Sequence, residues 1–267
     1  MQAGGNKRAM RDPHVVALHY HLEAGSQLKF MNAPSFEHAT HEFTVRLGGE
    51  ELRAEITDDP ATVATCYGKL DEFLRSWEIS TGLRYGAGAI RFRFEKAEVI
   101  NGPPGAELSQ ALRELLRPRG TVTLSVSGRR TLQQFPAPPV QFAARPDVVN
   151  MWERFEGYKR GREPLPGMAQ FCLTTIEQSV GGKQARRGAA ARYAIDFEVL
   201  RNLGRLTSDV GDARTGRKRT PTPRPHTHAE VAWMEAVVKR LIQRVGEWSA
   251  DQNTNWPPIT MNDFPKL

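Results

Sequence analysis

A proline-rich run at residues 136–146 constrains this chain more than any other feature. It contains Pro136, Pro138, Pro139 and Pro146. Each proline removes a backbone donor and fixes φ, so the run can be neither a central strand nor the interior of a helix. A chain of 267 residues is also long for a single core. We therefore expect the run to be a semi-rigid connector between two differently built parts.

The part before the connector is expected to be mainly a sheet. Apolar and polar residues alternate most clearly in the last long segment, where Ile90, Phe92 and Phe94 are separated by charged residues; this is the pattern of a half-buried strand. Gly48-Gly49 joins two such segments and predicts a hairpin. The expected strands are residues 15–23, 42–47, 51–57, 89–99 and 121–126.

One long helix is expected to cover this sheet. It opens at Pro60, and its apolar residues then recur at three- and four-residue steps. A shorter helix is expected around residues 108–116. The stripe of the long helix consists of Val63, Tyr67, Leu70, Phe73, Leu74 and Trp77.

After the connector the pattern is helical throughout. We expect Asp147 to cap a first helix and Pro166 to open a second, which ends at Gly181-Gly182. A third helical region spans residues 185–206, with a break near Ala194. Thr227 and Glu230 form a capping box ahead of the last helix. That helix carries an apolar stripe of Met234, Val237, Val238, Leu241, Val245 and Trp248.

The predicted fold class is thus α+β, a mostly antiparallel sheet with a covering helix, followed by an all-α helical bundle domain. The final residues, from Trp256 onward, are too apolar for a free terminus and are expected to pack into a surface groove. The expected divisions are a sheet domain at 1–135, the connector at 136–146, a helical domain at 147–250 and a tail at 251–267.

The positive charge is concentrated in one segment. Residues 1–144 carry 17 Lys and Arg against 16 Asp and Glu, whereas residues 183–224, the basic segment, carry 11 against 4. This surplus equals the whole net charge of +7. A local field of this kind attracts phosphate, although a solvated, solubilising face would have the same composition.

Several functional classes find no support in the sequence. No apolar run approaches the ~20 residues of a membrane span, and no apolar stretch follows the first charges as in a secretory signal, so we expect a cytoplasmic protein. Cys66 and Cys172 lie in apolar helical patterns that suit core residues. His19 and His21 share a strand face, but no standard metal-ligand spacing surrounds them, so we expect hydrogen-bonded or surface histidines and no metal.

Residues 186–203 resemble a helix-turn-helix element. Ala190 and Ala191 would be the small crossing residues and Ile195 the apolar residue after the turn. Ala194 stands where that motif usually has glycine, and acids occupy the start of the second helix. An ordinary corner in a helical bundle is the alternative. The resemblance and the surrounding charge imply a set of nucleic-acid-binding residues: Arg186, Arg187, Arg192, Arg201, Arg205, Arg214, Arg217, Lys218 and Arg219.

The order of a β-rich part followed by helices resembles bacterial defence proteins whose helical half is a HEPN domain. That family cleaves RNA with an Arg and a His a few residues apart on a helix. Arg219 and His226 have this spacing, so the resemblance implies them as formal catalytic candidates, but three prolines lie between them. Phrases such as Tyr158-Lys-Arg-Gly161 and Phe171-Cys-Leu-Thr174 also resemble bacterial proteins of similar length without an assigned function, which implies no activity.

These features lead to one hypothesis and two alternatives. The first is a non-catalytic, nucleic-acid-associated protein of bacterial type that uses the basic segment. The alternatives are a HEPN-like ribonuclease of a defence system, in a degenerate form if catalytic residues are missing, and a protein-interaction module without a nucleic-acid role. We expect no cofactor. A second copy of the chain or a protein partner would bind through the helical domain.

Overall fold

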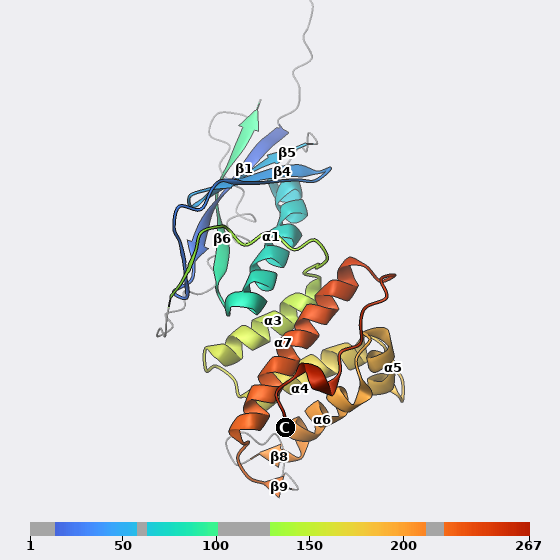
Figure 1. Cartoon of the computed structure of the whole chain (residues 1–267). Helices are drawn as coiled ribbons and strands as arrows, with labels where there is room; N and C mark the ends of the chain where they lie inside the picture. Colours follow the sequence, from blue (N-terminus) through green and yellow to red (C-terminus); the bar gives the residue numbers. More distant parts are fainter. Residues whose placement is uncertain (1–13, 58–62, 101–128, 212–221) are drawn as a thin grey trace, which may run out of the picture. The chain divides into compact units, whose positions relative to one another are not determined.

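A computed structural model describes residues 14–57, 63–100, 129–211 and 222–267 (Figure 1). The chain forms two compact units. One combines Met1–Leu74 with Ala89–Pro136, and the other combines Arg75–Gly88 with Ala137–Leu267. The helix expected at 108–116 and the strand expected at 121–126 lie outside the described residues.

The first unit contains a five-stranded sheet in the order β3-β4-β5-β1-β6, and every neighbouring pair in it is antiparallel. Gly49 joins β4 to β5 with a φ of 62°, which is the left-handed conformation that the predicted hairpin requires. The expected α+β class is confirmed. The strands of the sheet are β1 (His14–Ala24), β3 (Phe36–Ala39), β4 (Phe43–Gly48), β5 (Glu51–Ile56) and β6 (Ile90–Ile100).

The first half of α1 (Val63–Tyr85) covers one face of this sheet (Figure 1). The rings of Phe43 on β4 and Phe73 on α1 lie 5.2 Å apart, and those of Phe94 on β6 and Tyr67 on α1 lie 6.3 Å apart. The same unit contains a two-stranded parallel pair of β2 (Leu28–Phe30) and β7 (Arg130–Leu132).

The second unit is built from helices, as the sequence predicts. They are the second half of α1, from Arg75 on, and then α3 (Pro146–Lys159), α4 (Leu165–Gln178), α5 (Ala185–Arg192), α6 (Phe197–Ser208) and α7 (His228–Ala250), followed by a 3-10 turn at Met261–Asp263. The unit also has a parallel pair of two-residue strands, β8 (Val210–Gly211) and β9 (Thr222–Pro223), which the helical pattern did not predict.

The start of α7 follows the sequence, and the starts of α3 and α4 do not. Thr227 and Glu230 make the predicted capping box. In α3, however, Asp147 lies inside the first turn, and the N-cap is Arg145, whose side chain caps nothing. The cause is Pro146, which takes the first helical position because its missing N–H needs no partner there. Similarly, α4 begins at Leu165, after an N-cap at Pro164.

The apolar stripe of α7 forms much of the core of the second unit. Met234, Val237, Val238 and Leu241 are fully buried. Part of the proline-rich run joins this core, since Phe142 is buried and the amide of Ala143 donates to the carbonyl of Gly246 over 3.0 Å. The ring of Phe142 lies so close to α7 that only a glycine fits at position 246.

Candidate functional site

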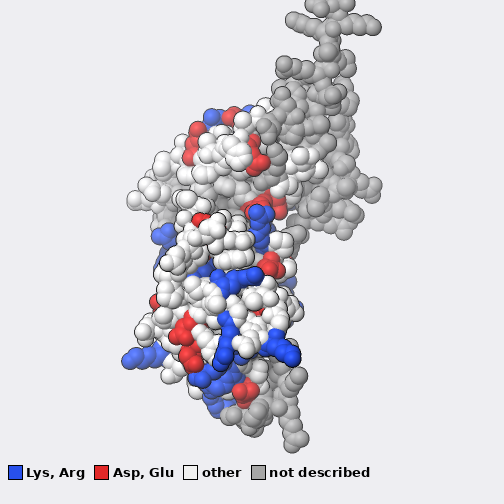
Figure 2. Space-filling model, turned by 90° about the vertical axis from the view of Figure 1, so that its right-hand side faces the viewer, with Lys and Arg blue, Asp and Glu red and all other residues white. Residues whose placement is uncertain are grey.

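The candidate site is the exposed basic surface of the second unit. Figure 2 shows lysine and arginine side chains gathering on the face of the helical part that it presents, with fewer acidic side chains among them. α5 and α6 supply most of the described cations of the basic segment. The exposed ones are Lys183, Arg187, Arg192, Arg201 and Arg205.

Three arginines of the basic segment are already neutralised. The Nε of Arg186 donates to Glu177 over 2.6 Å, and the guanidinium packs over Gly204. Arg201 forms an ion pair with Glu198 one turn earlier. Arg224 donates to both carboxylate oxygens of Glu230, over 2.8 and 2.6 Å. These three side chains contribute less to the surface field than their number indicates.

Two other arginines lie over aromatic rings. The guanidinium of Arg187 is 5.6 Å from the ring centre of Phe197, and that of Arg192 is 5.2 Å from the ring centre of Trp248. Arg192 also donates from Nη1 to the carbonyl of Ser179. Neither arginine has a carboxylate partner among the residues that the structure covers, so both retain an uncompensated charge at the surface.

Four of the predicted binding residues lie outside the described residues: Arg214, Arg217, Lys218 and Arg219. Of the HEPN-type pair, the structure therefore describes only His226. Its Nε2 lies 2.9 Å from the carbonyl oxygen of Leu206, and it precedes the N-cap of α7. His226 is therefore not on a helix, in contrast to the setting of the HEPN motif.

The helix-turn-helix-like segment does form two helices with a break between them. We call residues 193–196 the corner; within it, Ala194 has a φ of 48° and takes the place of the usual glycine. Ile195 is buried as expected. The predicted crossing pair needs one correction, because Ala191 is exposed, and the buried pair is Ala189 and Ala190.

The start of α6 is acidic and partly covered. Asp196 is the N-cap and accepts from the amide of Glu198 over 3.0 Å. Residues 251–267, the tail, lie against it: the amide of Asp196 donates to the carbonyl of Ile259 over 2.8 Å. Met261 approaches Asn202 with its sulfur 3.9 Å from the side-chain nitrogen. This end of α6 is poorly suited to entering the major groove of DNA, where the reading end of a helix must be free.

A buried arginine joins the corner to the tail. Arg244 on α7 is fully buried and donates to the carbonyls of Tyr193, over 2.6 Å, and Pro257, over 2.7 Å. Its Nε donates to Glu247 over 2.9 Å. Burial lowers the pKa of Arg244 from its ordinary value, and the hydrogen bond to Glu247 opposes this effect. The side chain remains a cation and has a structural role.

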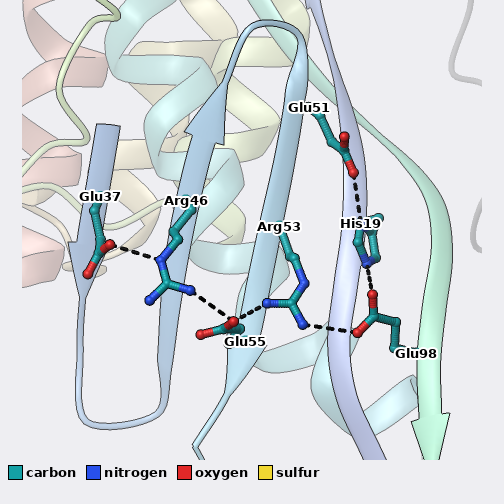
Figure 3. A network of polar contacts seen from close by, with 7 residues as sticks. All are labelled: His19, Glu37, Arg46, Glu51, Arg53, Glu55 and Glu98. Carbon is teal, nitrogen blue, oxygen red and sulfur yellow. Dashed lines mark hydrogen bonds and ion pairs between the residues drawn. The ribbon is translucent and has the colours of Figure 1, made fainter. Parts of the chain in front are cut away.

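A second polar cluster, the sheet network, lies on the face of the sheet away from α1. It crosses all five strands (Figure 3). The side chains of Glu37, Arg46, Arg53 and His19 occupy one cross-strand row. Glu55 accepts from Arg46 over 2.9 Å and also from Arg53.

His19 is the buried member of the sheet network. Its Nδ1 lies 3.1 Å from Glu51 and its Nε2 lies 2.7 Å from Glu98. Glu98 also accepts from Arg53 over 3.0 Å, and this hydrogen bond is the main cause that lowers the pKa of Glu98, with the contact to His19 second.

Sequence reasoning did not find the carboxylates beside His19. They come from strands 32 and 79 residues away, so only the register of the sheet brings them together. His38 lies on β3 and stacks on Phe73 of α1, with ring centres 5.3 Å apart. Within the described ranges, no three His, Cys, Asp or Glu side chains gather in a way that could hold a metal ion.

Comparison with protein-family models, with curated proteins and with solved structures finds no match to this chain. In the part of the chain that the structure describes, no helix has both the length and the apolar character that crossing a membrane needs. The contacts and charges of the chain itself are therefore the basis for the functional proposal.

Proposed function

We propose that this protein associates with nucleic acid without catalysing a reaction on it, and that the basic segment binds the phosphate backbone. The observation that carries the proposal is the pair of exposed arginines, Arg187 and Arg192, which face aromatic rings instead of carboxylates. Two further cations are also exposed: Arg205 on α6, and Lys183 just before the start of α5. Clustered cations of this kind favour phosphate over isolated acidic side chains.

The partly covered, acidic start of α6 disfavours the reading of base edges by this helix, which leaves the exposed cations to bind the phosphate backbone. The negative charges of Asp196 and Glu198 would repel the phosphates that border a groove. We therefore propose binding with little sequence preference, in which affinity depends strongly on salt. The ribonuclease alternative has weaker support, because His226 donates from Nε2 to the carbonyl of Leu206 and lies ahead of a helix.

The test is a salt series on binding. Wild-type protein is titrated with labelled duplex DNA, single-stranded DNA and structured RNA, starting at about 50 mM salt. A variant with Arg214, Arg217, Lys218 and Arg219 all changed to Gln should bind more weakly, and its log–log salt slope should flatten by up to about 0.9 per lost contact on duplex DNA.

The matched control makes the same change of charge on the sheet unit, at four exposed cations. Binding by this control should equal that of wild type. If the two variants lose affinity equally, net charge alone explains binding. If wild-type protein binds none of the three nucleic acids below about 10 μM, the proposal is wrong, and an acidic protein partner becomes the better explanation. The control residues are Lys29, Arg93, Lys96 and Arg130.

A further inference from the structure

The exposed arginines of α5 differ from ordinary surface cations in what lies beneath them. Arg187 lies over Phe197 of α6, and Arg192 lies over Trp248 of α7. Both rings are partly exposed. The indole of Trp248 also packs edge-to-face with the ring of Tyr193, and the two ring centres lie 5.4 Å apart. α5 therefore presents two arginine–aromatic pairs to solvent.

This arrangement suits unstacked bases. Bases in a single strand expose their faces and stack on aromatic rings and on guanidinium planes, with little regard to sequence. In a duplex those faces are hidden within the base stack, so the rings would gain nothing from it. The hydrogen bond from Arg192 to the carbonyl of Ser179 also holds that guanidinium beside Trp248 before any ligand arrives.

We infer that the ligand of this surface is single-stranded nucleic acid, held by stacking at Phe197 and Trp248 together with phosphate contacts from Arg187 and Arg192. The inference rests on the proposed function and narrows it to one class of ligand. The acidic start of α6, which the tail partly covers, agrees with it, because that helix end is not free to enter a duplex groove.

The decisive experiment uses wild-type protein and three ligands of equal length, each about twenty nucleotides, which exceeds the ~4–16 nucleotides that an OB-fold, a common single-strand-binding module, covers. They are a mixed-sequence single strand, the same strand as a duplex, and an abasic single strand that keeps the phosphates. The single strand with bases should bind about tenfold or more tightly than the abasic strand, and more tightly than the duplex.

Equal binding of the abasic and the ordinary strand, or tighter binding of the duplex, overturns this inference and leaves the proposed function standing. Absence of binding to all three overturns both. The two failures are thus distinguishable without any variant.

Substitutions then locate the stacking surface. Trp248→Leu and Phe197→Leu should each weaken binding of the single strand about fivefold or more, while the salt slope stays unchanged because the phosphate contacts remain. Phe171→Leu is the matched control. The guanidinium of Arg154 lies 4.6 Å from the ring centre of Phe171, and neither residue belongs to the basic segment. A loss of affinity in the control equal to that in Trp248→Leu contradicts the assignment, and circular dichroism verifies that each variant is folded.

Discussion

Arg244 on α7 donates from Nη1 to the carbonyl of Ala194, over 3.1 Å, at the point where the chain turns from α5 into α6. Ala194 has a left-handed φ, which costs an alanine about 1–2 kcal/mol. The corner is therefore not stable by its local sequence alone. It is held by a side chain from the last helix and by the tail, through the bridge between Ile195 and Ile259.

Replacing Arg244 by Met should lower the free energy of unfolding by about 2–5 kcal/mol. The change removes the donor from the carbonyls of three residues, and each such loss is costly where water cannot replace it. Urea unfolding followed by circular dichroism measures the effect. Arg240→Met is the control, because Arg240 also binds Glu247 but is partly exposed, and it should cost at most about 1 kcal/mol. Equal losses for the two variants would contradict the role given to Arg244.

Two glycines in helices should respond to alanine in opposite ways. In Gly246→Ala the new Cβ would overlap the ring of Phe142, so we expect a loss of about 1–3 kcal/mol from overpacking. In Gly167→Ala the nearest atom is a carbon of Pro164 at 3.6 Å, an ordinary contact. Better helix propensity should then raise stability by up to about 1 kcal/mol. Thermal unfolding of both variants provides the comparison, and a stable Gly246→Ala would show that the segment around Phe142 is loosely packed.

The capping box of α7 should give a pH-dependent contribution to stability. The hydrogen bond from Arg224 lowers the pKa of Glu230 from 4.5 to about 2. Because the pKa is lowered in the folded state, the contribution is fully present above about pH 4.5 and is lost as the pH falls toward about 2. Glu230→Gln keeps the shape of the cap and removes the charge. Urea unfolding should therefore show a difference between wild type and variant at pH 7 that closes over this range.

The control for this prediction is the same substitution in an Arg224→Gln background. There the effect of Glu230→Gln on the free energy of unfolding should already be small at pH 7, because the largest cause of the lowered pKa is gone. A difference that does not change with pH in the original background would show that the cap acts through hydrogen bonds alone.

In the sheet network, Glu55→Gln should destabilise the first unit by about 1 kcal/mol, and more at low salt. Arg46 and Arg53 are directly opposite each other, and Glu55 is the carboxylate that both contact. Without its charge the two guanidinium groups repel each other. Glu23→Gln is the control, since the pair of Glu23 with Arg93 is exposed and 3.8 Å long, and it should stay within about 0.5 kcal/mol. Chemical denaturation at two salt concentrations measures both, and a Glu55 effect independent of salt would contradict the explanation.

Local signals in the sequence predicted local structure well. The hairpin at Gly49, the capping box at Thr227 and the break at Ala194 each depend on residues within a few positions of one another. The helix starts expected at Asp147 and Pro166 are exceptions. Pro146 fixed where α3 begins, and α4 begins one residue before Pro166. A preference for one capping residue is weaker than the backbone constraint of a proline.

The candidate site was harder to predict because charge alone does not show which side chains are paired. Arg186 and Arg224 belong to the basic segment, but acids at positions 177 and 230, outside that segment, neutralise them. The aromatic partners of Arg187 and Arg192 lie on other helices, so their contacts depend on how the bundle packs. Periodicity predicts the helices themselves but not these tertiary neighbours.

The dependence of the corner on Arg244 has a consequence for the order in which the unit is completed. Arg244 follows Ala194 by 50 residues in the sequence. A ribosome that adds about 5–20 residues per second needs roughly 3–10 seconds to make that stretch. During this interval α5 and α6 exist without the side chain that joins them, and Trp248 has not yet been made. The surface that carries Arg187 and Arg192 therefore reaches its final geometry only after Arg244 and Trp248 have been made.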